Sequence, residues 1–291
     1  MIYTIQNDFL SAKISSLGAE LVSLVSKDTD TEYIWQGDER YWTGQSPIMF
    51  PICGRLAQGK YKYEGNIYEM GGHGFARKSE FDLNACGDNE ITFSLSSNKQ
   101  TRAQYPFEFT FYVTYSLKGK TLTVKYKVVN KDNKELIFTV GAHPAFNVPL
   151  GEGTFEDYYV EFNKSCDAVR LTFSEACLCD KRDPIYTLGG TKRIPLRHDL
   201  FDDDAIFLYN MAKKITLASD KSKRSVTMSF DDFKYLGLWH TPKKDAPYIC
   251  IEPWCGIPDD DGDVSELTSK REMIHLPIGY SFDSSYKIEV K

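Results

Sequence analysis

The sequence predicts an all-β protein, a large antiparallel β-sandwich with very little helix. Three observations carry this prediction. Apolar and polar side chains alternate in many short runs, turn residues separate these runs at short intervals, and helical periodicity is weak. Many short strands with little helix are typical of sandwiches built from large antiparallel sheets.

The clearest alternation lies in residues 107–117. Glu108, Thr110, Thr114 and Ser116 fall on one face, with Tyr112 among them. The other face is apolar and consists of Phe107, Phe109, Phe111, Val113, Tyr115 and Leu117. A Lys-Gly-Lys turn follows at 118–120, and residues 121–129 repeat the pattern. These two runs predict a β-hairpin.

Similar runs predict further strands along the whole chain. They lie at 2–6, 11–15, 20–26, 91–96, 136–142, 157–163, 205–209, 214–218, 225–230, 235–240, 247–252 and 286–290. The best helix signal is 264–270, where the preceding aspartates could cap a short helix. No linker rich in Pro, Gly or Ser divides the chain, so residues 1–291 are expected to form a single domain.

Charge and hydropathy exclude several classes of function. The net charge is −6 and the pI is about 5.5, which argues against a nucleic-acid surface, since that would need a basic patch. One local basic pocket could still hold a single phosphate. The first residues do not resemble a signal peptide, and no apolar run approaches membrane-spanning length. We therefore expect a cytoplasmic protein without membrane contact.

No metal or cofactor is predicted. The seven cysteines are scattered and odd in number, which is typical of reduced thiols. Cys177 and Cys179 form a C-x-C without a second pair or a nearby histidine. The acidic run 259–263 lacks the spacing and terminal glutamate of a calcium loop. Phosphate-binding, dinucleotide-binding and zinc-protease motifs are absent from the sequence.

Two histidines stand in settings that suggest a site. His73 lies in GGHGFAR, where flanking glycines indicate a tight loop with close backbone approach. His143 lies in GAHPAFNVP, where an alternating strand meets a proline and a side chain can point into a cleft. His198 resembles a surface residue, His240 could line a site or belong to the core, and His275 gives no signal.

A carboxylate and a guanidinium complete the candidate set. Glu252 lies in the apolar run YICIEPWCG, and a carboxylate there is rarely buried without a partner or a task. Arg55 is the first charge after the apolar segment 47–54. It could hold sugar hydroxyls or form a buried salt bridge with Glu252, and both alternatives place it near the same cleft.

Six motifs in order across residues 46–259 resemble the aldose 1-epimerase (galactose mutarotase-like) family, and most closely its LacX-like branch. They are SPIMFPICGRL, GGHGFAR, YPFEF, GAHPAFNVP, FDDDAIFL and IEPWCGIPD. The resemblance implies the family's β-sandwich. It matches the family's acid to His143, its base to Glu252, and its substrate-binding residues to His73, Arg55 and Asp203, with Asp204 the alternative to Asp203. The best-known galactose mutarotases have Asn-His where this chain has Ala142-His143, so the substrate does not carry over.

The resemblance implies an aldose 1-epimerase (mutarotase) that interconverts the α and β anomers of a hexose. His143 would protonate the ring oxygen while Glu252 deprotonates the C1 hydroxyl, because ring opening needs an acid and a base together. Positive charge on His73 and Arg55 is expected to keep Glu252 ionised.

Two alternatives stay open. A hexose-6-phosphate 1-epimerase would need cations at the far end of the sugar, for which Arg77 and Lys78 are candidates. A non-catalytic carbohydrate-binding protein on the same fold would not need the His143–Glu252 pair. The sequence leaves open which hexose or hexose phosphate binds, and whether the chain forms a homodimer.

Overall fold

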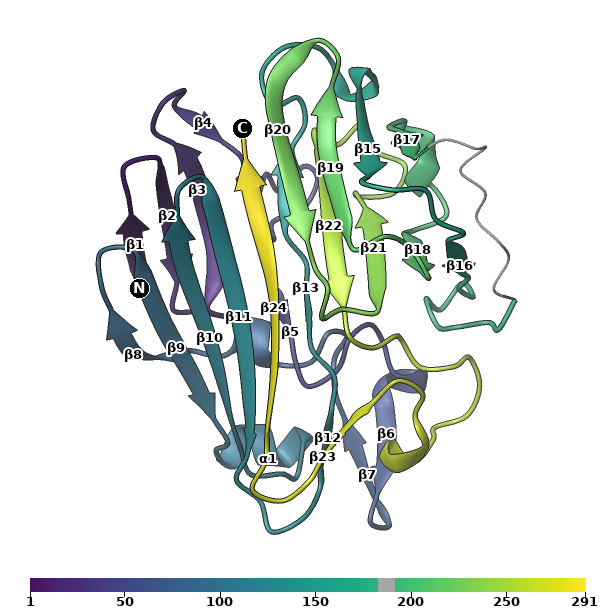
Figure 1. Ribbon diagram of the computed structural model, residues 1–291. Helices are drawn as coiled ribbons and strands as arrows, with labels where there is room; N and C mark the ends of the chain where they lie inside the picture. The colour runs from purple at the N-terminus through teal and green to yellow at the C-terminus, as the bar shows by residue number, and fades with distance from the viewer. Residues whose placement is uncertain (183–191) are drawn as a thin grey trace.

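The computed structural model describes residues 1–182 and 192–291 (Figure 1), and strands make up most of its regular structure. One α-helix, α1 (Lys99–Gln104), occurs in these ranges. Asn98 caps it by accepting hydrogen bonds from the backbone N–H groups of Gln100 and Thr101. Its six residues carry no apolar stripe, which is why periodicity did not predict it. No helix of the described ranges has the length and hydropathy to cross a membrane.

A nine-stranded antiparallel sheet forms the front layer in Figure 1. In order across the sheet, its strands are β17 (Arg193–Pro195), β15 (Tyr158–Phe162), β19 (Lys214–Ser219), β20 (Ser222–Ser229), β24 (Ser281–Val290), β11 (Thr121–Asn130), β10 (Phe109–Lys118), β9 (Glu90–Ser96) and β8 (Asp82–Cys86).

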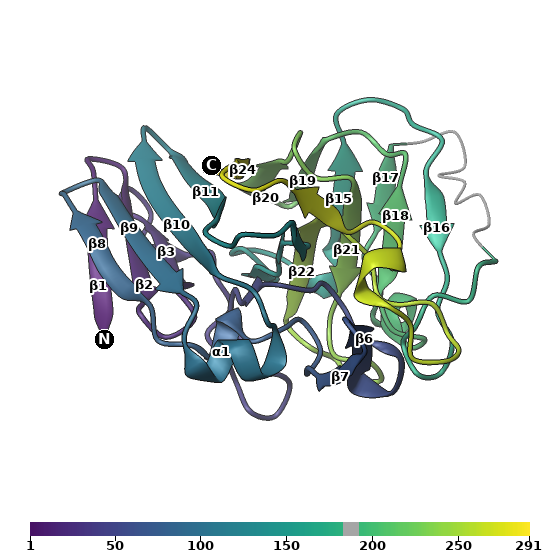
Figure 2. The same ribbon diagram turned by 90° about the horizontal axis from the view of Figure 1, so that it is seen from below.

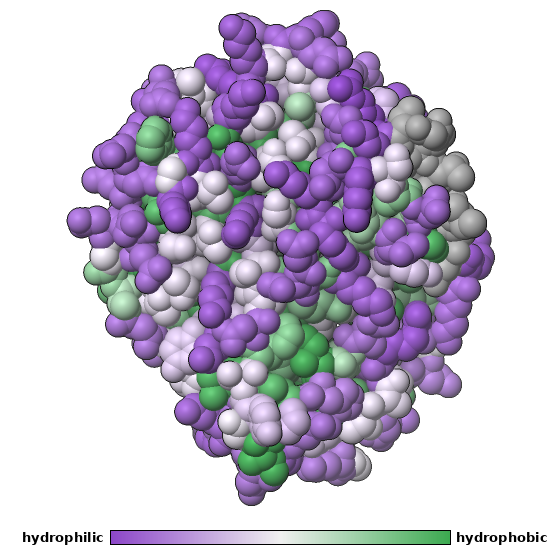
Figure 3. Space-filling view, in the orientation of Figure 1, coloured by the Kyte–Doolittle hydropathy of each residue, from purple (hydrophilic) through white to green (hydrophobic). Residues whose placement is uncertain are grey.

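The predicted hairpin of residues 107–129 is confirmed as β10 and β11, which pair from Phe109↔Asn130 to Lys118↔Thr121. The two-residue loop begins at Gly119, whose φ of 57° suits a glycine. The apolar side chains of both strands face inward and are buried. The outward face is mostly hydrophilic, as Figure 3 shows over the nine-stranded sheet.

Two further sheets lie behind the nine-stranded one in Figure 1, and Figure 2 shows the layers from below. A four-stranded sheet contains β1 (Ile2–Gln6), β2 (Leu10–Ser15), β3 (Glu20–Ser26) and β4 (Thr31–Glu32). A seven-stranded sheet has the order β16 (Val169–Leu171), β18 (Ile206–Tyr209), β21 (Tyr235–Trp239), β22 (Tyr248–Trp254), β13 (Gly141–Ala142) and β5 (Ile48–Met49), and β14 (Ala145–Asn147) also pairs with β22. The predicted antiparallel sandwich is thus confirmed.

Smaller elements join the layers. Two two-stranded sheets pair β6 (Lys60–Tyr63) with β7 (Asn66–Glu69) and β12 (Leu136–Phe138) with β23 (Ile274–Leu276). Single 3-10 turns occur at η1 (Ala57–Gly59), η2 (Ala76–Lys78), η3 (Phe155–Asp157), η4 (His198–Phe201) and η5 (Leu267–Ser269).

The prediction of a helix at 264–270 is wrong. This segment contains only the 3-10 turn η5, and no side chain caps it. The backbone there is used differently, because Ser265 O accepts a hydrogen bond from Lys62 N at 2.9 Å beside β6. Leu267 is the buried apolar anchor of the turn. So short a segment has too few helical hydrogen bonds to outweigh this tertiary contact.

Aromatic side chains fill the space between the layers. The Phe50 ring stacks on Phe111 of β10 with centroids 4.7 Å apart, and it meets Phe109 and Phe138 edge-on or tilted. Phe50 follows β5, so this contact fixes β5 and the adjoining loop against the nine-stranded sheet. That loop continues to Arg55, one of the candidate site residues.

Candidate functional site

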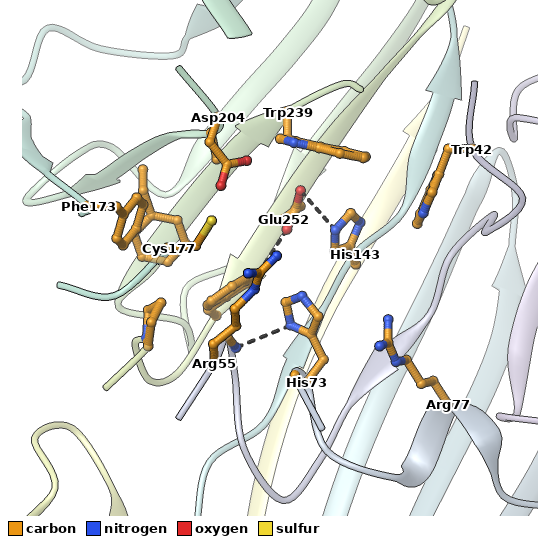
Figure 4. A pocket seen from close by; sticks show the side chains of 16 residues that line it. Trp42, Arg55, His73, Arg77, His143, Phe173, Cys177, Asp204, Trp239 and Glu252 are labelled. Carbon is orange, nitrogen blue, oxygen red and sulfur yellow. Dashed lines mark hydrogen bonds and ion pairs between the residues drawn. The ribbon is translucent and has the colours of Figure 1, made fainter. Parts of the chain in front are cut away.

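A cavity of about 420 Å³ opens at the seven-stranded sheet, and Figure 4 shows the side chains around it. Its size suits a small ligand. The lining contains four of the five candidate residues together with Asp204, the alternative to the fifth. The lining residues are Trp42, Gly54, Arg55, Gly72, His73, Arg77, His143, Phe173, Cys177, Asp204, Ala205, Phe207, Trp239, Glu252, Trp254 and Pro258.

Strand register brings His143 and Glu252 together. Gly141 of β13 pairs with Trp254, and Ala145 of β14 pairs with Cys250. His143 lies midway between Gly141 and Ala145, and Glu252 lies midway between Cys250 and Trp254, so the two stand opposite each other. His143 Nε2 is 3.3 Å from Glu252 Oε1, as the dashed line in Figure 4 marks. These two residues are 109 positions apart in sequence, yet the sheet makes them neighbours.

The opposite neighbour of Glu252 in the sheet is Gly237 of β21. A Cβ at this position would lie 3.3 Å from the Cβ of Glu252 and 3.3 Å from the Phe207 ring. Glycine therefore leaves the room that the carboxylate needs on the cavity face. Trp254 Nε1 donates a hydrogen bond to Glu252 Oε2 at 3.2 Å, which fixes the second oxygen.

Burial controls the protonation of the pair. Desolvation raises the pKa of Glu252 well above its ordinary value, and the nearby Asp204 charge raises it further, although the Trp254 bond acts the other way. Desolvation also lowers the pKa of His143 and that of His73. Burial therefore favours a carboxylic acid beside a neutral imidazole. The expectation that a positive charge on His73 keeps Glu252 ionised finds no support, because burial and the neighbouring positive charges both lower the pKa of His73.

His73 occupies a strained loop position. Its φ is 64°, and its N–H donates to Gly54 O at 2.7 Å. Its ring Nδ1 lies 3.2 Å from Gly54 N and accepts that N–H. A neutral ring then carries its proton on Nε2, and the ring faces the cavity beside His143, with centroids 5.7 Å apart. His73 is thus arranged as a hydrogen-bond donor toward a ligand.

Backbone conformation and crowding explain why residue 74, which follows His73, is a glycine. Its φ is 72°, and a Cβ there would lie 2.2 Å from Phe50 O. The loop of residues 71–75 therefore packs backbone to backbone against the end of β5. Phe75 N and Ala76 N both donate to Phe50 O, at 3.1 and 3.2 Å.

Arg55 extends over the cavity from an anchored loop. Its carbonyl accepts a hydrogen bond from Asp259 N at 2.8 Å. The Asp259 carboxylate also accepts from Ala57 N at 3.1 Å and forms a buried ion pair with Lys270. The side chain of Arg55 forms no ion pair with Glu252 among the interactions of the described residues, so the salt-bridge alternative left open by the sequence finds no support.

The acidic cluster 202–204 contributes Asp204 to the cavity. Asp204 has a φ of 79°, and its N–H donates to Phe201 O at 3.0 Å. Asp203 is exposed and does not line the cavity. The family resemblance favoured Asp203 with Asp204 as the alternative, and the turn after η4 places Asp204 at the cavity.

Several cavity residues carried no functional signal in the sequence. The Trp42 and Trp239 rings flank His143, with centroids 5.0 and 5.7 Å away. Trp42 comes from the irregular segment between β4 and β5, where its carbonyl accepts a hydrogen bond from Trp35 Nε1 at 2.8 Å. Phe173 and Cys177 also reach the cavity from a loop without a motif. Only the tertiary fold brings these residues to the site.

Arg77 lines the cavity, whereas the neighbouring Lys78 is exposed and does not. Figure 4 shows the Arg77 side chain on the same side of the cavity as His73. Its charge acts favourably on Glu20, whose carboxylate accepts hydrogen bonds from the N–H groups of Gln45 and Ser46.

Metal-binding potential in the described ranges is confined to one group of buried residues. One ligand atom each from His143, Cys250 and Glu252 lies within 4.8 Å of the others. Burial raises the pKa of the Cys250 thiol well above its ordinary value. Since the thiolate is the form that binds metals, this donor set fits a metal poorly.

The C-x-C of Cys177 and Cys179 and the acidic run 259–263 were the other two patterns considered for metals, and their side chains form other interactions. Cys179 Sγ–H donates to Pro258 O at 3.3 Å, while Cys177 lies at the cavity. In the acidic run, Asp259 pairs with Lys270, and Asp260 pairs with Arg271 and Lys181.

Comparison with known proteins places this site in a family. A family model described as aldose 1-epimerase matches residues 1–260. The chromosomal LacX protein of Lactococcus lactis is 38% identical over 301 residues, covering 100% of this chain and 99% of the relative. A galactose mutarotase related enzyme from Lactobacillus acidophilus has a TM-score of 0.95 at 37% identity, over 100% of this chain and 97% of that one.

A second solved structure agrees. The galactose mutarotase-like protein from Lactobacillus casei has a TM-score of 0.93 at 35% identity, and each chain is covered over its full length. Agreement in sequence and in structure over the whole length leads to one conclusion. The chain belongs to the aldose 1-epimerase family of carbohydrate isomerases, in its LacX-like branch.

Proposed function

We propose that this protein is a mutarotase that interconverts the α and β anomers of a free hexose in the cavity around His143 and Glu252. The observation that carries the proposal is the 3.3 Å separation of these two proton carriers at the wall of a ligand-sized cavity. Ring opening moves one proton to the ring oxygen and removes another from the C1 hydroxyl, so it needs two such groups together.

The pair holds one proton in two equivalent ways. A carboxylic acid with a neutral imidazole contains as many protons as a carboxylate with an imidazolium. Burial favours the carboxylic acid with the neutral imidazole. Transfer of the shared proton from Oε1 to Nε2 produces the second form, in which Glu252 is the base and His143 the acid.

In the proposed reaction, Glu252 takes the proton of the C1 hydroxyl while His143 gives its proton to the ring oxygen. The bond between C1 and the ring oxygen breaks, an open-chain aldehyde with a C5 hydroxyl forms, and rotation about C1–C2 exposes the other face of the aldehyde. The two groups then reverse their roles and close the ring. Each positioned proton transfer supplies about 10²–10⁴-fold acceleration.

The other cavity residues support sugar binding. His73, Arg55 and Asp204 offer donors and an acceptor for hydroxyl groups, and we assign the sugar-contacting carboxylate to Asp204 in place of Asp203. The Trp42 and Trp239 rings offer apolar surfaces for the C–H groups of a pyranose. The expected cytoplasmic location is part of this proposal, because buried cysteines such as Cys53 and Cys250 are thiols and not disulfides.

Polarimetry of the purified protein tests the proposal. It should accelerate the mutarotation of α-glucose or α-galactose, and Glu252→Gln should reduce kcat by at least about 100-fold, the lower end of the gain from one positioned proton transfer. Glu135→Gln is the matched control, because Glu135 is exposed and pairs with the distant His275. Equal rates for wild type and Glu252→Gln would refute the assignment. A wild type without activity that still binds sugar would favour a non-catalytic binding protein.

A hexose 6-phosphate is the second candidate substrate, and the observation that favours it is Arg77 at the cavity wall in addition to Arg55. Glucose and glucose 6-phosphate should be compared at two salt concentrations. Phosphate recognition requires tighter, salt-sensitive use of the phosphorylated sugar and its loss in Arg77→Met but not in Lys78→Met. Equal KM values for both sugars would exclude it.

A further inference from the structure

A pair of histidines lies next to the cavity without lining it. His198 begins η4, and His240 follows the last residue of β21. His198 Nδ1 is 3.1 Å from His240 Nε2, and His240 Nδ1 is 2.8 Å from Thr241 O. His240 is fully buried, and the His198 ring stacks on Phe155 with centroids 4.1 Å apart. His198 itself is half-buried, so the surface position that the sequence suggested is combined with a contact to the buried His240.

Hydrogen-bond chemistry fixes the direction of this contact. A carbonyl oxygen only accepts, so His240 Nδ1 must carry a proton toward Thr241 O. Burial lowers the pKa of His240 to about 4, which makes its ring neutral and its Nε2 an acceptor. His198 Nδ1–H must then be the donor. The hydrogen bonds therefore run from His198 through His240 to the backbone of Thr241. In this arrangement each ring carries a proton on its Nδ1.

This chain joins two segments that each deliver a residue to the cavity. The segment 198–204 ends in Asp204, and the end of β21 presents Trp239, directly before His240. A second link runs in parallel, because Lys243 N donates to Asp202 Oδ1 at 3.1 Å. The Phe201 ring also packs on His240, with centroids 4.4 Å apart. The histidine pair is the buried part of the connection that holds 198–204 against β21.

We propose that His198 and His240 are positioning residues that hold Asp204 at the distance from Trp239 at which it binds the sugar. The inference rests on the proposed function, since it assumes that Asp204 contacts the substrate. Neither histidine touches the reacting atoms, so their loss should weaken sugar binding and leave the proton transfers intact. The expected signature is a change in KM without a change in kcat.

His240→Leu tests this by removing the acceptor for His198. We expect KM to rise by about 3- to 10-fold, which is the effect of one net hydrogen bond, while kcat stays within about twofold. His240→Gln should restore most of the affinity, because a glutamine carbonyl can accept from His198 Nδ1. His198→Phe keeps the stacking on Phe155 but removes the donor, and it provides a second variant should His240→Leu fold poorly. His275→Leu is the control, because His275 is exposed and pairs with Glu135 instead of with either of these histidines.

A double-mutant cycle with Asp204→Ala separates positioning from general loosening of the fold. If the histidines act through Asp204, His240→Leu should have little further effect on KM in the Asp204→Ala background. A KM effect of the same size in both backgrounds would overturn the proposal, as would an unchanged KM in both His240→Leu and His198→Phe.

Should the wild type lack mutarotase activity, the proposed function fails on its own, and the same cycle is run on glucose affinity. Quenching of tryptophan fluorescence is a suitable probe, because Trp42 and Trp239 line the cavity. Coupling between His240 and Asp204 in that Kd would still support the positioning role, and strict additivity would still refute it.

Discussion

The buried ion pair between Lys270 and Asp259 gives a sharp prediction about stability. Only 4% of the Lys270 side chain and 7% of the Asp259 side chain are exposed. Lys270 also donates to Ser265 Oγ at 2.9 Å, while Asp259 accepts from Ala57 N at 3.1 Å. Lys270→Met removes the ammonium group and leaves the carboxylate buried without its counter-charge. Loss of one partner from a buried pair costs about 3–5 kcal/mol of unfolding free energy.

Urea denaturation at pH 7, followed by circular dichroism and fluorescence, measures this cost. A protein somewhat shorter than this chain loses about 2–4 °C in Tm for each kcal/mol of unfolding free energy. A parallel thermal scan should therefore show a decrease in Tm of at least about 6 °C. Lys120→Met is the control. Its partner Asp28 and Lys120 itself are 48% and 41% exposed, so we expect a change within about 1 kcal/mol.

A double variant identifies the cause. Asp259→Asn combined with Lys270→Met keeps an acceptor for Ala57 N but buries no charge, and it should regain most of the stability lost in Lys270→Met. If Lys270→Met and Lys120→Met are equally stable, the argument from burial is wrong. If the double variant is less stable than Lys270→Met alone, the uncompensated carboxylate is not the cause of the loss.

Three further predictions concern acid stability, loop packing and the site's pH dependence. Burial lowers the pKa of His240 to about 4, below its ordinary 6.5, so the unfolded state binds more protons in this range and stability falls as pH decreases. His240→Gln should therefore reduce the slope of unfolding free energy against pH by about 1.2 kcal/mol per pH unit between pH 6 and 5, measured by urea titration; an unchanged slope would contradict the assignment. Gly74→Ala should destabilise by about 1–3 kcal/mol more than Gly65→Ala, since both have positive φ but only Gly74 is crowded, and equal denaturation midpoints would refute this. Trp254→Phe removes a donor that lowers the pKa of Glu252, so the midpoint of the alkaline limb of kcat/KM, where the pair loses its single proton, should move to higher pH; a profile that stays in place would show that this bond does not control the pair.

Period-two alternation predicted the strands of the fold well. It identified Ile2–Gln6 and Glu20–Ser26 with their bounds as the structure has them, and the long hairpin of β10 and β11. It missed β7, which is mostly exposed, and β8, all five of whose residues are exposed. Alternation depends on one buried face, so strands without a clear buried face leave little pattern in the sequence.

The site was predictable where a residue's chemistry conflicts with its surroundings. Glu252 stood out because β22 is buried along its whole length, and His143 stood out because proline interrupts a strand. Trp42 and Phe173 could not be predicted, because aromatic residues are frequent throughout the chain and only tertiary packing selects these two. The sequence could not decide between Asp203 and Asp204, because which of two adjacent aspartates lines the cavity depends on the local turn, in which Asp204 has a φ of 79°.

The opposition of His143 and Glu252 depends on the ladder between β22 and its two short partners, β13 and β14. A one-residue insertion in β22 before position 252 would move the carboxylate to the reverse side of the sheet, because successive side chains of a strand alternate. Alignment of the proposed catalytic pair and correct strand pairing are therefore the same structural requirement in this molecule. Loops at the rim can change length without moving this pair, whereas a deletion inside the ladder would separate the two proposed proton carriers even if the chain still folded.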